Sequence, residues 1–249
     1  MDQQGLLLCA KYAASPNFFG YCGPDESKSI VDHLKEEIAD PELKHHLLEF
    51  ETLYPYLELI SRENKIEDPF DKSVVEAYWI GNSLLNRING LDYMHFLTER
   101  LDFESKMDKK LFGKVKRKVM ENGFIPHHTH HVFNIFKRTG KINSNHTIET
   151  MDSCRINWGK IIPTTLIQKS KIKSIFVETT QLVIKNQQLT IKPIIKEILI
   201  DYKGTAFIRN LKPNDFVSFH WRHVCDILTA RQIKNLEFYT KKAIDYYNL

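Results

Sequence analysis

The sequence predicts an α+β protein, with an all-helical N-terminal domain over residues 1–145 and a small β-barrel-like domain with C-terminal helices over residues 146–249. Two observations carry this prediction. Apolar residues recur at helical spacing over residues 27–122. After residue 150 the period shortens to two, and short runs rich in β-branched and aromatic residues follow one another. The domain boundary is drawn at this change of period and at the polar stretch of residues 139–145.

The helical half is built from segments with recognisable first and last residues. Ser27 or Ser29 provides the N-cap of a first helix, which ends at Asp40. Asp40 and Pro41 then supply the N-cap and the first-turn proline of a second helix over residues 43–53. The remaining helical segments are residues 56–60 after a kink or restart at Pro55, residues 72–86 after Asp71, and residues 105–121 before the C′ glycine Gly123.

The β half consists of short strands that are separated by turn residues. The predicted strands are residues 174–177, 180–184, 189–191, 197–202, 206–208 and 216–220. Short strands of this kind, joined by turns, favour a small barrel. Residues 225–247 follow as one or two C-terminal helices.

Length and composition exclude several classes of protein. With 249 residues and 42% hydrophobic content, the chain can bury a sizeable core. We find no signal-peptide pattern and no apolar run of about 18 residues, so we expect neither secretion nor a membrane span. The cysteines Cys9, Cys22, Cys154 and Cys225 show no CxxC spacing. Their number and spacing favour the reducing cytoplasm over a disulfide-stabilised, secreted protein.

The excess of positive charge is mild, at a formal net charge of +4. Residues 106–118 are strongly basic but lack interleaved aromatic side chains, so we do not expect nucleic acid binding. This segment is either a solvated helix face or a docking surface for an acidic partner protein.

Two short segments in the second half suggest a metal site. The first, residues 154–161, places Cys154 five positions before Gly159, at the start of a predicted strand. The second, residues 214–220, ends a β-type run with His220. Thiolate and neutral imidazole together suit iron, zinc and copper. The alternative is a buried structural cysteine and a histidine that packs at the end of its strand.

These motifs resemble those of the hydrogenase-assembly chaperone family (HypC/HupF). The shared pattern is Cys-x4-Gly-x-Ile, followed by Asn-Asp-aromatic-Val-x-apolar-His and an apolar helix, and it covers residues 151–230. As a whole, the chain also looks like an uncharacterised prokaryotic family of about this length.

The chaperone resemblance implies a non-enzymatic accessory protein for nickel-iron hydrogenase assembly. Cys154 and His220 would hold iron, either bare or as a cyanide- and carbonyl-ligated precursor, with zinc or no metal as the alternative. The implied partners are the hydrogenase large-subunit precursor, which the protein would chaperone, or other maturation proteins. His223, Cys225 and Asp226 would support the ligands or simply form the first turn of the following helix.

A second candidate metal site lies in the cluster of His127, His128, His130 and His131. In a helix, His127 and His131 share a face, whereas in a strand His128 and His130 do. Either pair could bind zinc or iron with further ligands, for which Glu76 is a candidate. The alternative function is therefore a metal-dependent enzyme, an oxygenase or a hydrolase. A third interpretation is that these histidines bind no metal and are either packed in the core or exposed to solvent. The protein would then act only by binding a partner protein.

The loop of residues 20–27 places Cys22 shortly before a capped helix. Its glycines, Gly20 and Gly23, permit close approach of a ligand, and a nearby helix N-terminus stabilises a thiolate. Both a tight structural loop and a reactive site fit this pattern.

Overall fold

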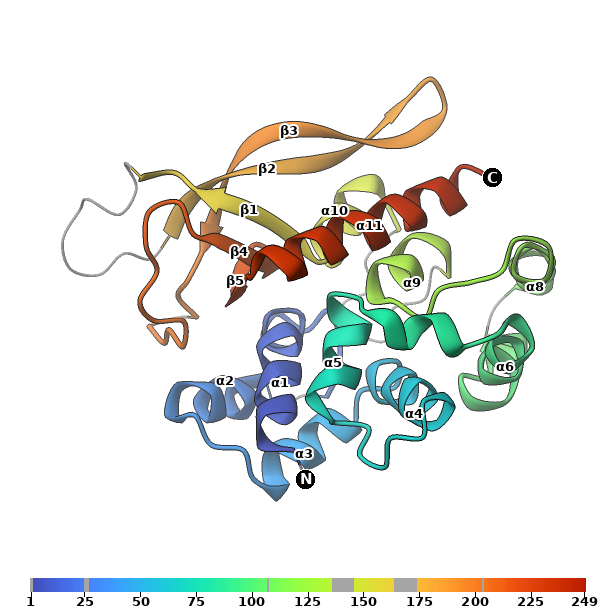
Figure 1. Cartoon of the computed structure of the whole chain (residues 1–249), viewed down its shortest axis with the longest axis horizontal. Helices are drawn as coiled ribbons and strands as arrows, with labels where there is room; N and C mark the ends of the chain where they lie inside the picture. The colour runs from blue at the N-terminus through green and yellow to red at the C-terminus, as the bar shows by residue number, and fades with distance from the viewer. Residues whose placement is uncertain (1, 25–26, 107, 136–145, 164–173, 203) are drawn as a thin grey trace.

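The structure, a computed structural model, describes residues 2–24, 27–106, 108–135, 146–163, 174–202 and 204–249. Helices fill the N-terminal region, a five-stranded sheet follows, and a long helix comes last (Figure 1). The predicted α+β class is confirmed. The polar stretch at which the sequence places the domain boundary, residues 139–145, lies outside the described residues.

Short helices make up the first part of the chain. They are α1 Gln3–Phe18, α2 Ser27–Glu36, α3 Pro41–Leu48, α4 Leu53–Glu63, α5 Lys72–Trp79, α6 Gly90–His95, α7 Phe103–Lys106, α8 Lys109–Asn122, α9 His128–Asn134 and α10 Ile148–Cys154. A 3₁₀ segment, η1 Ser83–Arg87, follows α5, and a π-helical segment, η2 Phe96–Arg100, follows α6.

The sequence pattern missed α1 and misjudged several helix boundaries. The helix predicted over residues 43–53 ends at Leu48, and the next helix begins at Leu53, before Pro55 rather than after it. Helix α1 is buried over most of its surface, so it lacks the amphipathic period that identifies a surface helix. The helix predicted over residues 72–86 ends at Trp79, because Gly81 adopts a φ of 96°. The basic helix begins at Lys109 rather than residue 105, because Asp108 caps it, and Gly123 ends it with a φ of 71° as predicted.

The strands are β1 Asn157–Ile161, β2 Ser174–Lys185, β3 Gln188–Leu199, β4 Phe216–His220 and β5 His223–Ile227. The sheet closes on itself in the order β1-β2-β3-β5-β4, because β1 also pairs with β4. Neighbouring strands are antiparallel except for β3 and β5. The closed sheet surrounds its own small cluster of apolar side chains: Ile161, Ile175, Val177, Ile198, Val217, Phe219 and Val224.

Several predicted strand boundaries were wrong. Residues 174–177 and 180–184 form one strand, β2, which pairs with β3 without interruption from Ser174 to Lys185. Residues 206–208 lie outside the strands. Residues 225–227 belong to β5 rather than to the C-terminal helix, which is the single helix α11, Ala230–Tyr247.

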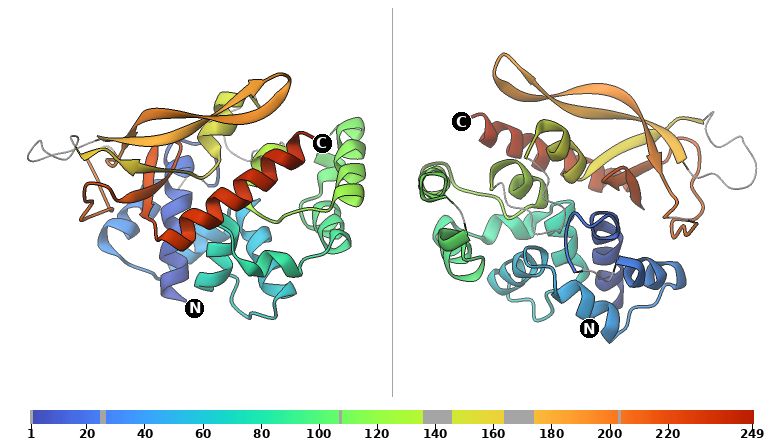
Figure 2. Two further views of the ribbon diagram at one scale, coloured as in Figure 1. Left: turned by 45° about the horizontal axis from the view of Figure 1, so that its top comes forward. Right: turned by 180° about the vertical axis from the view of Figure 1, so that it is seen from behind.

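The largest hydrophobic cluster joins the two regions of the chain. It contains buried side chains of the N-terminal helices together with side chains that follow residue 150: Ile156, Tyr202, Phe207, Cys225, Leu228, Leu236 and Tyr239. Helix α1 packs against β4 and β5, and α11 lies against α9 and β3. Figure 2 shows α11 running between the sheet and the helices. This packing brings residues from distant parts of the sequence to one place.

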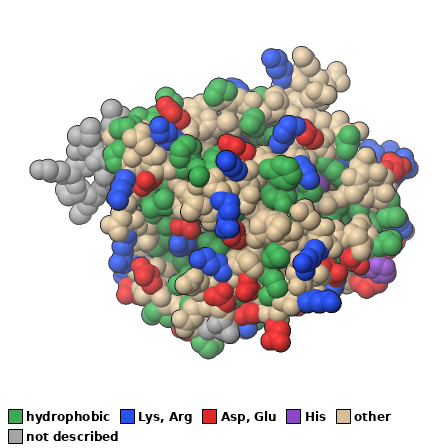
Figure 3. Space-filling model, viewed as in Figure 1, with side chains coloured by type: hydrophobic (Ala, Val, Ile, Leu, Met, Phe, Trp, Pro, Cys, Tyr) green, Lys and Arg blue, Asp and Glu red, His purple; other side chains and the backbone are tan. Residues whose placement is uncertain are grey.

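The surface carries charges of both signs. On the face shown in Figure 3, Lys and Arg side chains alternate with Asp and Glu side chains. No helix in the described ranges is long and apolar enough to cross a lipid bilayer.

Candidate metal centre

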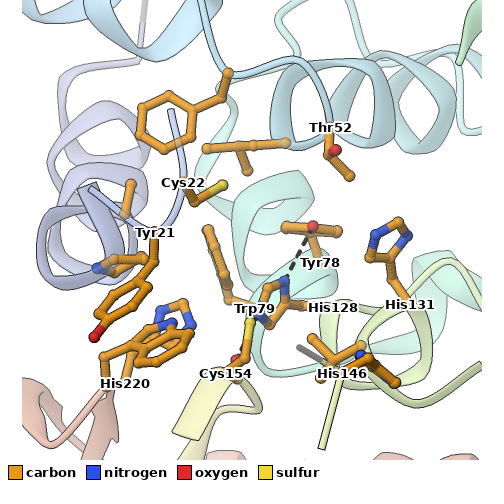
Figure 4. A pocket seen from close by; sticks show the side chains of 16 residues that line it. Tyr21, Cys22, Thr52, Tyr78, Trp79, His128, His131, His146, Cys154 and His220 are labelled. Carbon is orange, nitrogen blue, oxygen red and sulfur yellow. Dashed lines mark hydrogen bonds between the residues drawn. The ribbon is translucent and has the colours of Figure 1, made fainter. Parts of the chain in front are cut away.

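Three side chains with metal-binding atoms meet where the helices contact the sheet. His128, Cys154 and His220 each offer one ligand atom, and these atoms lie within 4.8 Å of one another. His128 is the first residue of α9, Cys154 the last residue of α10 and His220 the last residue of β4. The structure thus brings together Cys154 and His220, the two residues that the sequence motifs single out, and adds His128 from the histidine cluster (Figure 4).

Cys154 is held in place by a buried ion pair beside it. The Arg155 Nε donates to Asp152 Oδ1 over 3.0 Å, and Arg155 Nη2 donates to the Thr180 carbonyl in β2 over 2.8 Å. Asp152 Oδ1 also accepts from the Leu182 amide. Arg155 is fully buried, and burial lowers its pKa while Asp152 opposes that shift. These contacts fix the end of α10 against the sheet.

His128 makes two hydrogen bonds that define its tautomer. Its Nε2 lies 2.9 Å from the Cys154 carbonyl oxygen, which can only accept, so Nε2 carries the proton. Its Nδ1 then accepts from the Tyr78 hydroxyl over 3.1 Å. Burial, and then His220, hold the pKa of His128 well below its usual value. The imidazole is therefore neutral, as a metal ligand must be.

His220 is oriented by a backbone carbonyl of α1. Its Nδ1 lies 2.8 Å from the carbonyl oxygen of Tyr12, so Nδ1 is protonated and donates. The lone pair is therefore on Nε2. Metal-binding histidines commonly donate their second ring nitrogen to a carbonyl or carboxylate in this way.

The three residues line a narrow cavity of about 50 Å³. Such a space holds a few water molecules or a small ligand and is far smaller than a site for a large substrate. Tyr21 and Trp221 line it as a stacked pair, with ring centroids 3.8 Å apart and an interplanar angle of 8°. Further lining residues include Cys22, Tyr78, Trp79, His131 and His146 (Figure 4).

The other histidines of the cluster lie outside the group of described residues whose ligand atoms meet, although His131 lines the same cavity. Helix α9 begins after His127, so His127 and His131 do not share a helical face as the pattern suggested. His127 stacks on Tyr239, and burial lowers the pKa of His127 to about 3. Burial also lowers the pKa of His130 to about 3. His131 Nδ1 bonds to the hydroxyl of Tyr56 over 2.9 Å.

Glu76 is buried on α5 but faces α11 rather than these histidines. Its two carboxylate oxygens accept from Arg231 Nη2 over 3.1 and 3.2 Å. Glu76 is absent from the groups of described residues whose ligand atoms meet.

The residues expected to support the ligands lie in β5, not in the first turn of a helix. His223 Nδ1 is 3.3 Å from the Ser15 hydroxyl, and Asp226 pairs with Lys11 over 2.9 Å. Cys225 is fully buried, and burial raises its pKa well above the usual value. These side chains anchor α1 to the sheet and so hold the backbone that orients His220.

Two features of the site have no signal in the sequence. The position of His128 depends on how α9 packs against α10 and β4, which local spacing does not encode. His146 lies in the cavity wall with no motif around it.

Comparison with known proteins gives a family but no activity. One family model spans the whole chain, residues 1–249, and its description is "Family of unknown function (DUF6390)". No curated protein and no solved structure matches the chain. The expected likeness to an uncharacterised family is thus confirmed, whereas the resemblance of residues 151–230 to hydrogenase-assembly chaperones finds no support among these matches.

Proposed function

The chain belongs to the DUF6390 family of unknown function, and we propose from its own side chains that it binds a thiolate-preferring transition metal through His128, Cys154 and His220. Iron is our candidate for this metal, with zinc as the alternative. We further propose that the protein is an accessory factor in nickel-iron hydrogenase assembly. In that role the iron is cargo, and the partners are the large-subunit precursor or other maturation proteins.

The observation that carries the metal proposal is the meeting of two buried imidazoles and one half-buried thiol. This donor set suits iron, zinc and copper and is a poor one for magnesium or calcium. Donor atoms of a tetrahedral ion with bonds of 2.0–2.3 Å lie roughly 3.3–3.8 Å apart. Side chains whose ligand atoms are within 4.8 Å of one another need only small rotations to reach that spacing.

The role in assembly is supported by the combination of donors and space. Three protein ligands leave a fourth position open, and open positions are typical of sites that exchange a ligand. The cavity beside the three residues has room for a few small, non-protein ligands on the metal. Cys154 and His220 are the two residues for which the chaperone resemblance implies iron handling.

A metal-dependent oxygenase or hydrolase is the second candidate. One observation favours it: His128, which belongs to the cluster on which that hypothesis was based, is part of the three-residue group. The same open position would then bind a substrate. The test below separates the two, because a carrier gives up its metal to a partner and an enzyme retains it.

The test is anaerobic purification of the full chain after co-expression with hydrogenase accessory proteins, followed by metal analysis and infrared spectroscopy. We expect bound iron with cyanide and carbonyl stretches, and loss of both in Cys154→Ala. Cys22→Ser is the matched control, because Cys22 lines the same cavity but lies outside the three-residue group. Metal without these stretches, retained when the large-subunit precursor is added, would favour the enzyme. No metal bound to the wild-type chain would overturn both.

A further inference from the structure

A second group of potential metal ligands lies at the junction of α2 and α3. His33 of α2, Asp40 at the N-cap of α3 and Glu42 in the first turn of α3 each offer one ligand atom, and these atoms are within 4.8 Å of one another. His33 Nε2 and Asp40 Oδ1 lie 3.2 Å apart. The group shares no residue with His128, Cys154 and His220.

The tautomer of His33 calls for a positive charge between its ring and Asp40. The Nδ1 atom lies 2.8 Å from the Ser29 carbonyl oxygen, which can only accept, so Nδ1 is protonated. In the neutral ring, Nε2 then points a lone pair at the carboxylate of Asp40. Two acceptors at this distance repel each other unless a proton or a cation lies between them. A histidine whose Nδ1 donates to a carbonyl while its Nε2 faces a carboxylate has the arrangement of a metal ligand.

His46 adds a fourth donor beside this group. Its Nε2 lies 3.7 Å from Glu42 Oε1, and its ring centroid is 6.3 Å from that of His33. The Ser29 hydroxyl lies between the rings, 3.0 Å from His46 Nε2 and 3.3 Å from His33 Nδ1. His33 and His46 are nearly buried, with side-chain exposures of 10% and 8%, whereas Asp40 and Glu42 are open to solvent. An ion can therefore enter from the carboxylate side.

The local charge also favours a cation. Residues 32–51 contain seven Asp and Glu residues and only two Lys residues, in a chain whose formal net charge is +4. The amide of Leu43 donates to Asp40 Oδ1 over 2.9 Å, and this hydrogen bond holds the carboxylate at the start of α3.

We propose that His33, Asp40 and Glu42 form a second metal site, which takes a divalent first-row cation with His46 as its fourth ligand. Two imidazoles and two carboxylates form a donor set that suits zinc and other first-row divalent ions. The 3.2 Å between His33 Nε2 and Asp40 Oδ1 is close to the roughly 3.3 Å expected for two ligands on one tetrahedral zinc. The absence of sulfur from this set separates it chemically from the site at Cys154.

The experiment uses zinc and cobalt(II) as probes on the full, metal-free chain. In Cys154→Ala, zinc should still bind at one equivalent. In that background, His33→Ala and Asp40→Asn should each weaken zinc binding by at least ten-fold in a calorimetric titration. Asp40→Asn is informative because asparagine still caps α3 while the negative charge is lost. His45→Ala is the matched control, because His45 lies on the same helix but pairs with Glu49, and it should bind zinc as before.

Cobalt distinguishes this proposal from the one at Cys154. Cobalt bound to a thiolate gives a sulfur-to-metal charge-transfer band, whereas cobalt at the second site gives only the weaker bands of nitrogen and oxygen ligands. Cobalt binding without the charge-transfer band would support the second site and reject the first. Absence of zinc binding in Cys154→Ala, or zinc affinity unchanged by both His33→Ala and Asp40→Asn, would overturn the second site.

Discussion

The Nε2 atom of His128 donates a hydrogen bond to the backbone carbonyl of Cys154 over 2.9 Å. This bond joins the first residue of α9 to the last residue of α10, so two of the three candidate ligands position each other directly. It also leaves the lone pair of His128 on Nδ1, where the hydroxyl of Tyr78 occupies it.

Tyr78→Phe should tighten metal binding. In this variant the Nδ1 atom of His128 no longer accepts a hydrogen bond from Tyr78. A metal can then bind Nδ1 without first breaking that hydrogen bond. We expect a several-fold lower Kd for cobalt or iron(II) and a loss of about 1–2 kcal/mol in the unfolding free energy of the metal-free protein. Tyr93→Phe is the control, because its buried hydroxyl bonds to Tyr56 instead, and it should lower stability without changing the Kd. A weaker or unchanged Kd in Tyr78→Phe would show that Nδ1 of His128 is not a ligand.

Lowering the pH should reduce the free energy of unfolding, because the buried histidines take up protons when the chain unfolds. Burial lowers the pKa of His127 and of His130 to about 3, below the ordinary value of 6.5, so the unfolded chain binds more protons. Stability is therefore complete above pH 6.5 and falls as the pH drops towards 3. Each histidine contributes a slope of roughly 1.4 kcal/mol per pH unit in that window. Urea unfolding between pH 7.5 and 4.5 measures this slope.

His130→Phe should reduce that slope and raise stability at pH 7. Neither ring nitrogen of His130 has a hydrogen-bond partner among the described residues, and the ring packs between Phe124 and Tyr246. An apolar ring removes the cost of burying these atoms, which we estimate at about 1 kcal/mol. An unaltered slope would mean that His130 takes up a proton in the folded protein.

The buried ion pair beside Cys154 should be essential to stability. Arg155→Met leaves the carboxylate of Asp152 buried beside Lys196, its remaining charged partner 3.2 Å away. We expect a loss of about 3–5 kcal/mol in denaturant unfolding. The exposed pair of Lys241 and Asp245 is the control, and Lys241→Met should change little. Equal effects of the two substitutions would remove the argument that Arg155 anchors the end of α10.

Replacing two helical glycines by alanine should change the stability of the protein in opposite directions. A Cβ atom at Gly5 of α1 would overlap the backbone carbonyl oxygen of Phe70, which cannot move aside easily. Gly5→Ala should therefore destabilise the protein by about 3 kcal/mol. A Cβ at Gly113 of α8 meets no described atom within 4 Å, so Gly113→Ala should stabilise by about 0.5–1 kcal/mol. Thermal unfolding of the pair tests how tightly α1 packs.

The sequence predicted the fold class because the change from helical to alternating apolar spacing is a local signal. It did not predict α1, whose burial on most sides hides the period. It also missed β5, because the turn before this strand uses Trp221 and Arg222 at φ values of 48° and 67°. Such values are usually signalled by glycine or asparagine.

The sequence indicated individual residues of the candidate site only where they belong to a short motif. Cys154 and His220 stood out through their spacing to neighbouring residues. His128 stood out for a different reason, its neighbouring histidines, and was assigned to a separate site. Joining the three requires α9 to pack against α10 and α1 to pack against β4, and these contacts are long-range properties of the fold.

The three candidate ligands are synthesised in the order His128, Cys154, His220, and this order has a consequence during translation. When Cys154 leaves the ribosome, the strand that ends in His220 does not yet exist, and β1 lacks its partner β4. A nascent chain therefore presents a thiol and one imidazole without the remaining donor or the closed sheet. Under the proposed function, binding of a metal by all three residues has to follow the emergence of β4, and until then the thiol of Cys154 lacks its complete site.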